Sequence, residues 1–255
     1  MAPYVLSFLY EQFTAKLTPT DADLAGRTFL VTGSNTGRKI HVWELDMADF
    51  ASVKKFATRA NAELERLDGA ALNAGVNTSQ WTLTTDGWER TLQVNALATG
   101  LLAILLLPLL QKTAGLPALS GFAMVPHLTI TGSSCKLFNV YLARKIAGLE
   151  QAKGIVVNVV NPGLCSSELA RDIPIPSFAL PIIRFVAWSC AKGSLNLLYS
   201  LLNGTPSGSY VTACAVSQPP RWTLDESGLR VQERVWNEMV ELWRTIEPGV
   251  DGLLV

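Results

Sequence analysis

The sequence predicts an α/β protein with a parallel sheet that is covered by helices on both faces. Apolar strands alternate with helices along the 255 residues, and the strands are continuous apolar runs, as expected for strands buried on both sides. No repeat or low-complexity linker interrupts this alternation. We therefore expect a single domain over residues 1–255, with an N-terminal extension at 1–23 and a C-terminal extension with a helix at 209–255.

Hydrophobic periodicity places the individual elements. Strands are expected at 28–32, 40–45, 69–75, 127–134 and 155–163. Helices are expected at 49–67, 86–110, 136–149, 192–202 and 226–246. Asp49 stands where an N-cap of the first helix belongs, because its side chain can accept from the first free backbone amides.

Composition narrows the classes of function. Lys and Arg (21) balance Asp and Glu (21), so no net positive charge attracts nucleic acid. The apolar run at 101–110 is too short to span a bilayer and contains Pro108, which favours a buried helix. The N-terminus has no basic region before its apolar residues, so we expect no export signal and a cytoplasmic protein. The proline-broken segment 176–188 fits either a substrate lid or a peripheral membrane contact.

The cysteines and histidines give no sign of a metal centre. The four cysteines show no CxxC spacing and no interleaved histidine, so we expect reduced thiols and no metal. His41 and His127 have no partner in sequence that suggests a catalytic triad, and both are expected at the surface or at a sheet edge.

Glycine and polar residues follow the ends of several strands. The motif TGSNTG at 32–37 follows the first strand, and its glycines let backbone N–H groups approach a pyrophosphate, although a plain loop explains it equally well. Asn73-Ala74-Gly75 ends a buried strand, and NPGLCSSEL at 161–169 ends another. Asn95 lies inside an apolar helix, where it is either a satisfied core amide or a site residue.

In this order and spacing, the motifs resemble those of the short-chain dehydrogenase/reductase family, from about residue 24 to residue 208. The resemblance implies a Rossmann-like, doubly wound sheet and hydride transfer between NADP (or NAD) and a small apolar carbonyl or alcohol substrate. The apolar N-terminus and long C-terminal extension look most similar to reductases of fungal secondary-metabolite pathways and to retinol-dehydrogenase-like relatives. A homodimer built on the helices at 86–110 and 136–149 is also implied.

The resemblance carries specific roles to this chain. The catalytic residues that it implies are Ser133, Lys136 and Asn95. The cofactor-binding residues that it implies are Gly33, Asn35, Gly37, Asp46, Asn73, Lys136 and Ser167.

Part of the first βαβ unit is missing from this pattern. The acidic residue that contacts the cofactor usually follows the glycine turn by about 20 positions, whereas Asp46 lies 13 positions past Gly33. The segment 38–45 reads as a strand, so no helix stands behind the turn. We therefore expect impaired cofactor binding, because a helix N-terminus normally faces the pyrophosphate.

A second gap lies between Ser133 and Lys136. The family has a tyrosine four residues before the lysine, but position 132 is glycine. Tyr141 and Lys145 form a YxxxK pair of their own, yet they lie too late in the helix and are expected to pack rather than to catalyse. Two alternatives to a competent enzyme stay open: an inactive relative that binds a ligand or partner, or an inaccurately spliced gene sequence.

Overall fold

The computed structural model describes residues 10–33, 40–119, 124–132, 136–167, 169 and 176–255. Its six-stranded sheet has the order β1-β2-β3-β4-β5-β6, parallel except for the antiparallel pair β5 and β6. The strands are β1 (Phe29–Val31), β2 (Gly69–Leu72), β3 (His127–Thr131), β4 (Val156–Asn161), β5 (Ser209–Thr212) and β6 (Ala215–Ser217). The predicted α/β, Rossmann-like fold is confirmed.

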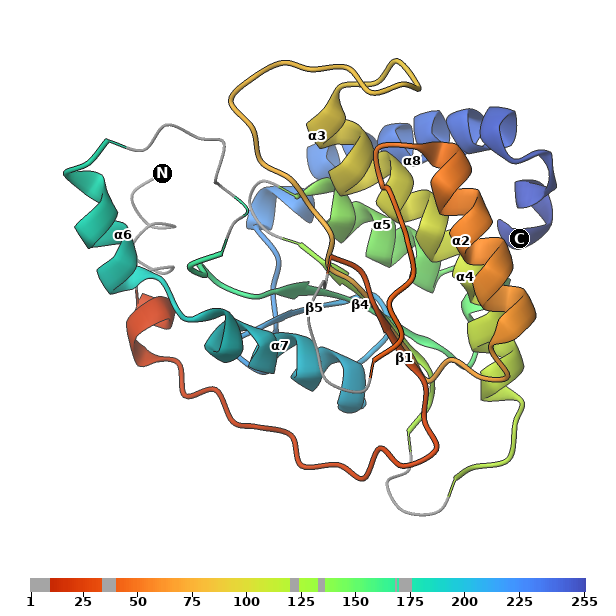
Figure 1. Cartoon of the computed structure of the whole chain (residues 1–255), viewed down its shortest axis with the longest axis horizontal. Helices are drawn as coiled ribbons and strands as arrows, with labels where there is room; N and C mark the ends of the chain where they lie inside the picture. Colours follow the sequence, from red (N-terminus) through yellow and green to blue (C-terminus); the bar gives the residue numbers. More distant parts are fainter. Residues whose placement is uncertain (1–9, 34–39, 120–123, 133–135, 168, 170–175) are drawn as a thin grey trace.

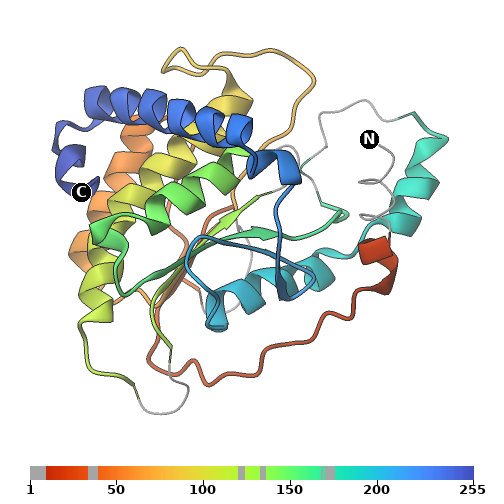
Figure 2. The same cartoon turned by 180° about the vertical axis from the view of Figure 1, so that it is seen from behind.

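Helices cover both faces of this sheet (Figures 1 and 2). The α-helices are α2 (Phe50–Glu63), α3 (Arg90–Leu92), α4 (Ala98–Ala114), α5 (Phe138–Ala147), α6 (Ala179–Val186), α7 (Cys190–Leu202) and α8 (Glu226–Ile246). A π-helical segment, η1 (Gln93–Leu97), joins α3 to α4, and short 3-10 turns lie at Glu150–Ala152, Arg221–Thr223 and Pro248–Leu253. Figure 1 shows α2, α4 and α5 together on one face and α7 on the other.

The N-terminus of α2 forms as its sequence predicts. Asp49 has an extended backbone, and its Oδ1 accepts from the Ala51 amide at 2.9 Å. Phe50, Val53 and Phe56 are buried on one side of the helix, which follows the 3.6-residue period of the apolar residues. The cap and the apolar face agree, and the helix begins at the predicted residue.

The hydrophobic core is unequal on the two faces of the sheet. The large cluster lies between the sheet and the layer of α2, α4 and α5, and α8 closes it with the fully buried Trp243. Trp243 also donates its indole N–H to the Leu97 carbonyl at 3.0 Å. Among the described residues, the cluster under α7 has three buried members, Ala71, Leu201 and Leu202. The large face therefore carries most of the hydrophobic stabilisation, which grows with buried apolar area.

The strand predicted at 40–45 is wrong, because residues 40–46 form no regular structure. Trp43 packs instead on α2, with its ring 5.8 Å from that of Phe56 and the Arg59 guanidinium 4.1 Å from its centroid. These contacts hold the segment along α2 rather than beside β1. In the described part of the chain β1 is consequently an edge strand, and Val31 at its end is 48% exposed.

One helical stretch, Arg90–Ala114, is long and apolar enough to cross a membrane. Its most apolar window is 83% buried within the protein, however. The stretch contains Pro108 and lies between α2 and α5 in the large core. The buried helix that the sequence predicts here is confirmed. The burial identifies this stretch as the central helix of the core.

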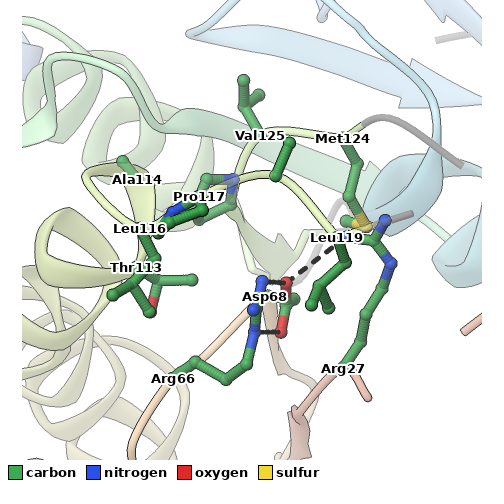
Figure 3. A pocket seen from close by; sticks show the side chains of 12 residues that line it. Arg27, Arg66, Asp68, Thr113, Ala114, Leu116, Pro117, Leu119, Met124 and Val125 are labelled. Carbon is green, nitrogen blue, oxygen red and sulfur yellow. Dashed lines mark hydrogen bonds and ion pairs between the residues drawn. The ribbon is translucent and has the colours of Figure 1, made fainter. Parts of the chain in front are cut away.

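An ion cluster joins the amino ends of β1 and β2, beside a pocket of about 360 Å³ (Figure 3). Asp68 is 2% exposed and accepts from Arg66 Nε at 2.8 Å, from Arg66 Nη2 at 2.6 Å and from the Thr28 amide at 2.9 Å. Arg27 Nη1 lies 3.4 Å from the same carboxylate. Burial alone would raise the pKa of Asp68, but these partners together hold it below its usual value.

His127 is also buried, although the sequence predicts it at the surface or at an edge. It is 1% exposed, and its ring nitrogens lie 2.7 Å from the Val125 carbonyl and 3.0 Å from the Asn203 carbonyl. Its position as the first residue of a central strand explains the burial, because both neighbouring strands are occupied. Burial lowers its pKa.

Candidate active and cofactor site

The candidate site begins where β1 and β2 end. Gly33 has φ +77°, and a Cβ there would stand 3.0 Å from the Ala74 Cα. The Thr32 hydroxyl accepts from the backbone amides of Asn73 and Ala74, each at 3.0 Å. Because glycine alone fits this conformation and this close approach, the glycine turn and the Asn-Ala-Gly motif form one unit.

Asn73 extends this unit to β3. Its Oδ1 accepts from the Thr131 hydroxyl at 3.2 Å, and Asn139 Nδ2 donates to the Thr131 carbonyl at 2.8 Å. The carboxyl ends of three neighbouring strands are thereby tied together by polar side chains. This is the edge of a parallel sheet at which ligands bind.

Asn95 approaches the same edge from the π-helical segment. Its Nδ2 donates to the Val76 carbonyl at 2.7 Å, and its Oδ1 accepts from the Val76 amide at 3.0 Å. The Asn95 amide is therefore satisfied, as one of the two sequence-based interpretations expects, and its role as a site residue stays a prediction. Single π-helical turns often occur at functional sites, where the wider turn redirects a side chain.

Lys136 meets Asn95 over Gly75. The side chain of Lys136 is 7% exposed, and its Nζ donates to the Ala74 carbonyl at 2.8 Å. A Cβ on Gly75 would collide with Lys136 Nζ and with Asn95 Oδ1, so both groups converge on that backbone. Burial lowers the pKa of Lys136 to about 8. In the described part of the chain, no carboxylate forms an ion pair with this amine.

The position that the family gives to its tyrosine is occupied by the end of β3. The Gly132 amide donates to the Val160 carbonyl at 2.8 Å, so Gly132 continues the strand. A Cβ on Gly132 would collide with the Val159 side chain. A larger side chain at this position would have to displace the Val159 side chain.

The alternative pair, Tyr141 and Lys145, belongs to the packing between α5 and α8. Tyr141 is buried, and burial raises its pKa. Lys145 forms an ion pair with Glu233 at 2.8 Å, and its Nζ lies 5.7 Å from the centroid of the Trp236 ring. The amine that would activate the phenol is therefore committed to α8, in agreement with the predicted packing role.

The remaining predicted residues are not joined to this cluster by any contact that the structure describes. Asp46 is exposed, and its Oδ1 accepts from the Ala48 amide at 2.8 Å. Ser167 is exposed on the loop after β4, where its Oγ lies 3.4 Å from the Leu169 amide. Asn35, Gly37 and Ser133 lie outside the described residues.

The structure adds supporting residues that the sequence did not single out. Thr32 is part of the TGSNTG motif, so attention to its hydroxyl could have found it. Thr131 had no such signal, because threonine is common in strands. Within the described residues, no group of three or more His, Cys, Asp and Glu side chains is placed to hold a metal ion.

Comparison with known proteins decides the family. A family model described as short chain dehydrogenase matches residues 22–175, which is more than half of the chain. The chain belongs to the short-chain dehydrogenase family. Its matched region begins before β1 and ends after β4, so it includes Gly33, Asn73, Asn95 and Lys136.

Curated short-chain dehydrogenases align over nearly the whole chain. The short chain dehydrogenase/reductase dmxR8 of Cryptosporiopsis sp. (strain 8999) is 29% identical over 327 aligned positions, covering 96% of this chain and 99% of that protein. Since the chain has 255 residues, at least 72 of those positions have no counterpart here. The short-chain dehydrogenase/reductase phmF of Phaeosphaeria nodorum is 30% identical, covering 84% of this chain and 73% of that protein.

A solved structure supports the fold independently. A protein of Mycobacterium Paratuberculosis without assigned function superimposes with a TM-score of 0.54 at 19% identity, over 78% of this chain and 74% of that one. At this identity the likeness concerns the fold alone.

Proposed function

We propose that this short-chain dehydrogenase is an NAD(P)-dependent oxidoreductase of a small apolar carbonyl or alcohol, acting in the cytoplasm in secondary metabolism. The observation that carries the proposal is the buried Lys136 amine, which converges with Asn95 on the Gly75 backbone at the carboxyl edge of the sheet. Fungal relatives that align over most of the chain support the same family activity.

The residues at this edge fit the nicotinamide side of a dinucleotide. An ammonium has three N–H donors, and one of those of Lys136 is used by the Ala74 carbonyl, which leaves donors for ribose hydroxyls. Lys136 and Asn73 would hold the nicotinamide half. The cofactor, when bound, supplies or accepts the hydride.

Lys136 also offers the acid that the missing tyrosine would have provided. An ammonium with a pKa of about 8 is a stronger acid than an ordinary lysine and can give its proton to a developing alkoxide. Positioned proton donors typically contribute about 10²–10⁴-fold in rate. We therefore assign general acid catalysis to Lys136 and the positioning of the Gly75 backbone to Asn95.

This assignment predicts a specific pH profile. Carbonyl reduction needs the ammonium, so its rate should fall as the pH rises through about 8, whereas alcohol oxidation needs the free amine and should rise over the same interval. Initial rates in both directions between pH 6 and pH 10, at saturating cofactor, measure this. Rates that do not change between pH 7 and pH 9 would contradict the role of Lys136 as the acid.

A second candidate function is that of a ligand-binding relative without catalysis. Gly132 favours it, because glycine stands where the family has its tyrosine and supplies no proton donor. Titration of the protein with NADPH, followed by the fluorescence of the reduced cofactor, tests directly whether the chain can be an NAD(P)-dependent enzyme. Saturable NADPH binding is expected, and no binding at millimolar NADPH would leave only the second candidate. Sequencing of the transcript would test whether the missing blocks were lost through inaccurate splicing.

The family homodimer would need a different surface in this chain. The helix α8 packs on α5, and Trp243 lies against Gly100 at the beginning of α4. We therefore propose that any homodimer uses a face other than the one formed by α4 and α5. For α6 we propose a substrate lid or a peripheral membrane contact, because the helix has exposed apolar side chains, among them Ile182 and Phe185.

A further inference from the structure

We infer that the site recognises only the nicotinamide mononucleotide half of its cofactor, so that NMNH, NADH and NADPH bind equally well. This inference rests on the proposed function, because it concerns the ligand of the same site. It goes further in naming which part of the ligand the chain contacts.

The strand order gives the first reason. A dinucleotide-binding sheet consists of two mononucleotide-binding halves, and the ligand lies across the point where the strand order reverses. Here the order runs in one direction from β1 to β6, with β1 at the edge. In the described residues, no strand lies beyond β1 to form the second half of the crevice. Only the half that contains β2, β3 and β4 remains.

Among the described residues, no free helix terminus follows β1 to face the pyrophosphate. Residues 40–49 form neither helix nor strand, so the first described helix after β1 is α2 (orange in Figure 1). Its first two amides are already taken by carboxylates: the Phe50 amide donates to Asp86 Oδ2 and the Ala51 amide to Asp49 Oδ1, each at 2.9 Å. Two carboxylates at this terminus would repel a phosphate instead of holding it.

Asp46, the acidic residue that the family resemblance places beside the adenosine, is hydrogen-bonded to neighbouring residues of its own turn. Asp46 Oδ1 accepts from the Ala48 amide, and the Asp46 amide donates to the Ser52 hydroxyl at 2.9 Å. Both bonds shape the turn that leads into α2. Asp46 therefore serves the start of a helix, and it is exposed on that turn.

The other half keeps built contacts. Lys136 and Asn95 are buried and meet at Gly75, and Asn73 is fixed between Thr32 and Thr131. These groups lie at the carboxyl ends of β2 and β3, which are on the side of β1 where the described sheet continues. The binding free energy should therefore come from the nicotinamide and its ribose, whereas the adenosine moiety adds none.

The test is a comparison of three cofactors by nicotinamide fluorescence with the full chain. We expect dissociation constants for NMNH, NADH and NADPH within about threefold of one another, and no displacement of NMNH by millimolar AMP. Tighter binding of NADH or NADPH by tenfold or more, or displacement by AMP, would overturn the inference and leave the proposed function intact. No binding of any of the three would overturn both.

Two variants sharpen the comparison. Lys136→Met should weaken all three cofactors alike, by tenfold or more, because it removes the donor to the shared half. Asp46→Ala should leave the NADH and NMNH affinities unchanged. If Asp46→Ala weakened NADH while sparing NMNH, the adenosine half would have a contact after all and the inference would fail.

Discussion

Asp68→Asn is expected to lower the free energy of unfolding by about 3–5 kcal/mol, the usual loss when one partner of a buried ion cluster is removed. The side chains of Asp68 and Arg27 are each only 3% exposed, and that of Arg66 is 17% exposed. An amide in place of the carboxylate would remove the negative charge that Arg66 and Arg27 face at this buried side chain. Urea unfolding at pH 7, followed by circular dichroism, measures the loss.

The pH dependence separates this cause from a simple change of shape. The pKa of Asp68 is held below its unfolded value, so the carboxylate stabilises the fold above about pH 3.9, and this stability disappears as the pH falls through the folded pKa. The difference between the wild-type protein and Asp68→Asn should therefore shrink in acid.

A matched control is available in the exposed pair Arg59 and Glu63, whose side chains are 47% and 54% exposed. Glu63→Gln should cost no more than about 0.5 kcal/mol, because an exposed pair four residues apart on a helix contributes little. An equal loss in Asp68→Asn and Glu63→Gln would show that burial of the cluster does not matter.

The sheet was predictable from the sequence because its central strands are buried on both faces. Such strands are continuous apolar runs, and β2, β3 and β4 each lie where such a run predicts them. The segment 40–45 is less apolar, because it contains His41 and Glu44, and it pairs with no strand in the described residues. Trp43 packs on α2 instead. A local sequence pattern indicates a preference for an extended backbone. It does not indicate which strand the segment pairs with, because that depends on the rest of the chain.

The site was predictable in part for the same reason. Parallel strands present their carboxyl ends at one edge, which brings Gly33 and Asn73 together. The convergence of Asn95 and Lys136 on Gly75 could not be derived from spacing, since it depends on a π-helical turn and on a shortened connection after β3. The burial of His127 was missed because its neighbour strands come from distant parts of the sequence.

Lys136→Met should make the protein more stable and the site inactive. At pH 7 the wild-type protein holds an ammonium in a site that lowers its pKa from 10.5 to about 8, which corresponds to about 3 kcal/mol of unfavourable free energy at roughly 1.4 kcal/mol per pKa unit. Methionine fills a similar volume without a charge, although it loses the hydrogen bond to the Ala74 carbonyl, worth about 1 kcal/mol. We expect a net gain of about 2 kcal/mol in the free energy of unfolding.

The sign of the pH dependence makes this prediction specific. Since the folded pKa of Lys136 lies below the unfolded value, the wild-type protein gains stability as the pH rises from about 8 to about 10.4, and the advantage of Lys136→Met should disappear over that interval. Lys145→Met, which removes an amine paired with Glu233 at the surface, is the matched control and should change the free energy of unfolding at pH 7 by no more than about 1 kcal/mol. Urea unfolding of the three proteins at pH 7 and pH 10 measures both effects.

A Lys136→Met protein less stable than the wild type at pH 7 would mean that favourable contacts hold the amine. In that case the charged lysine would stabilise the fold. A gain in stability with loss of cofactor binding would instead mark Lys136 as a residue retained for function at the expense of the fold.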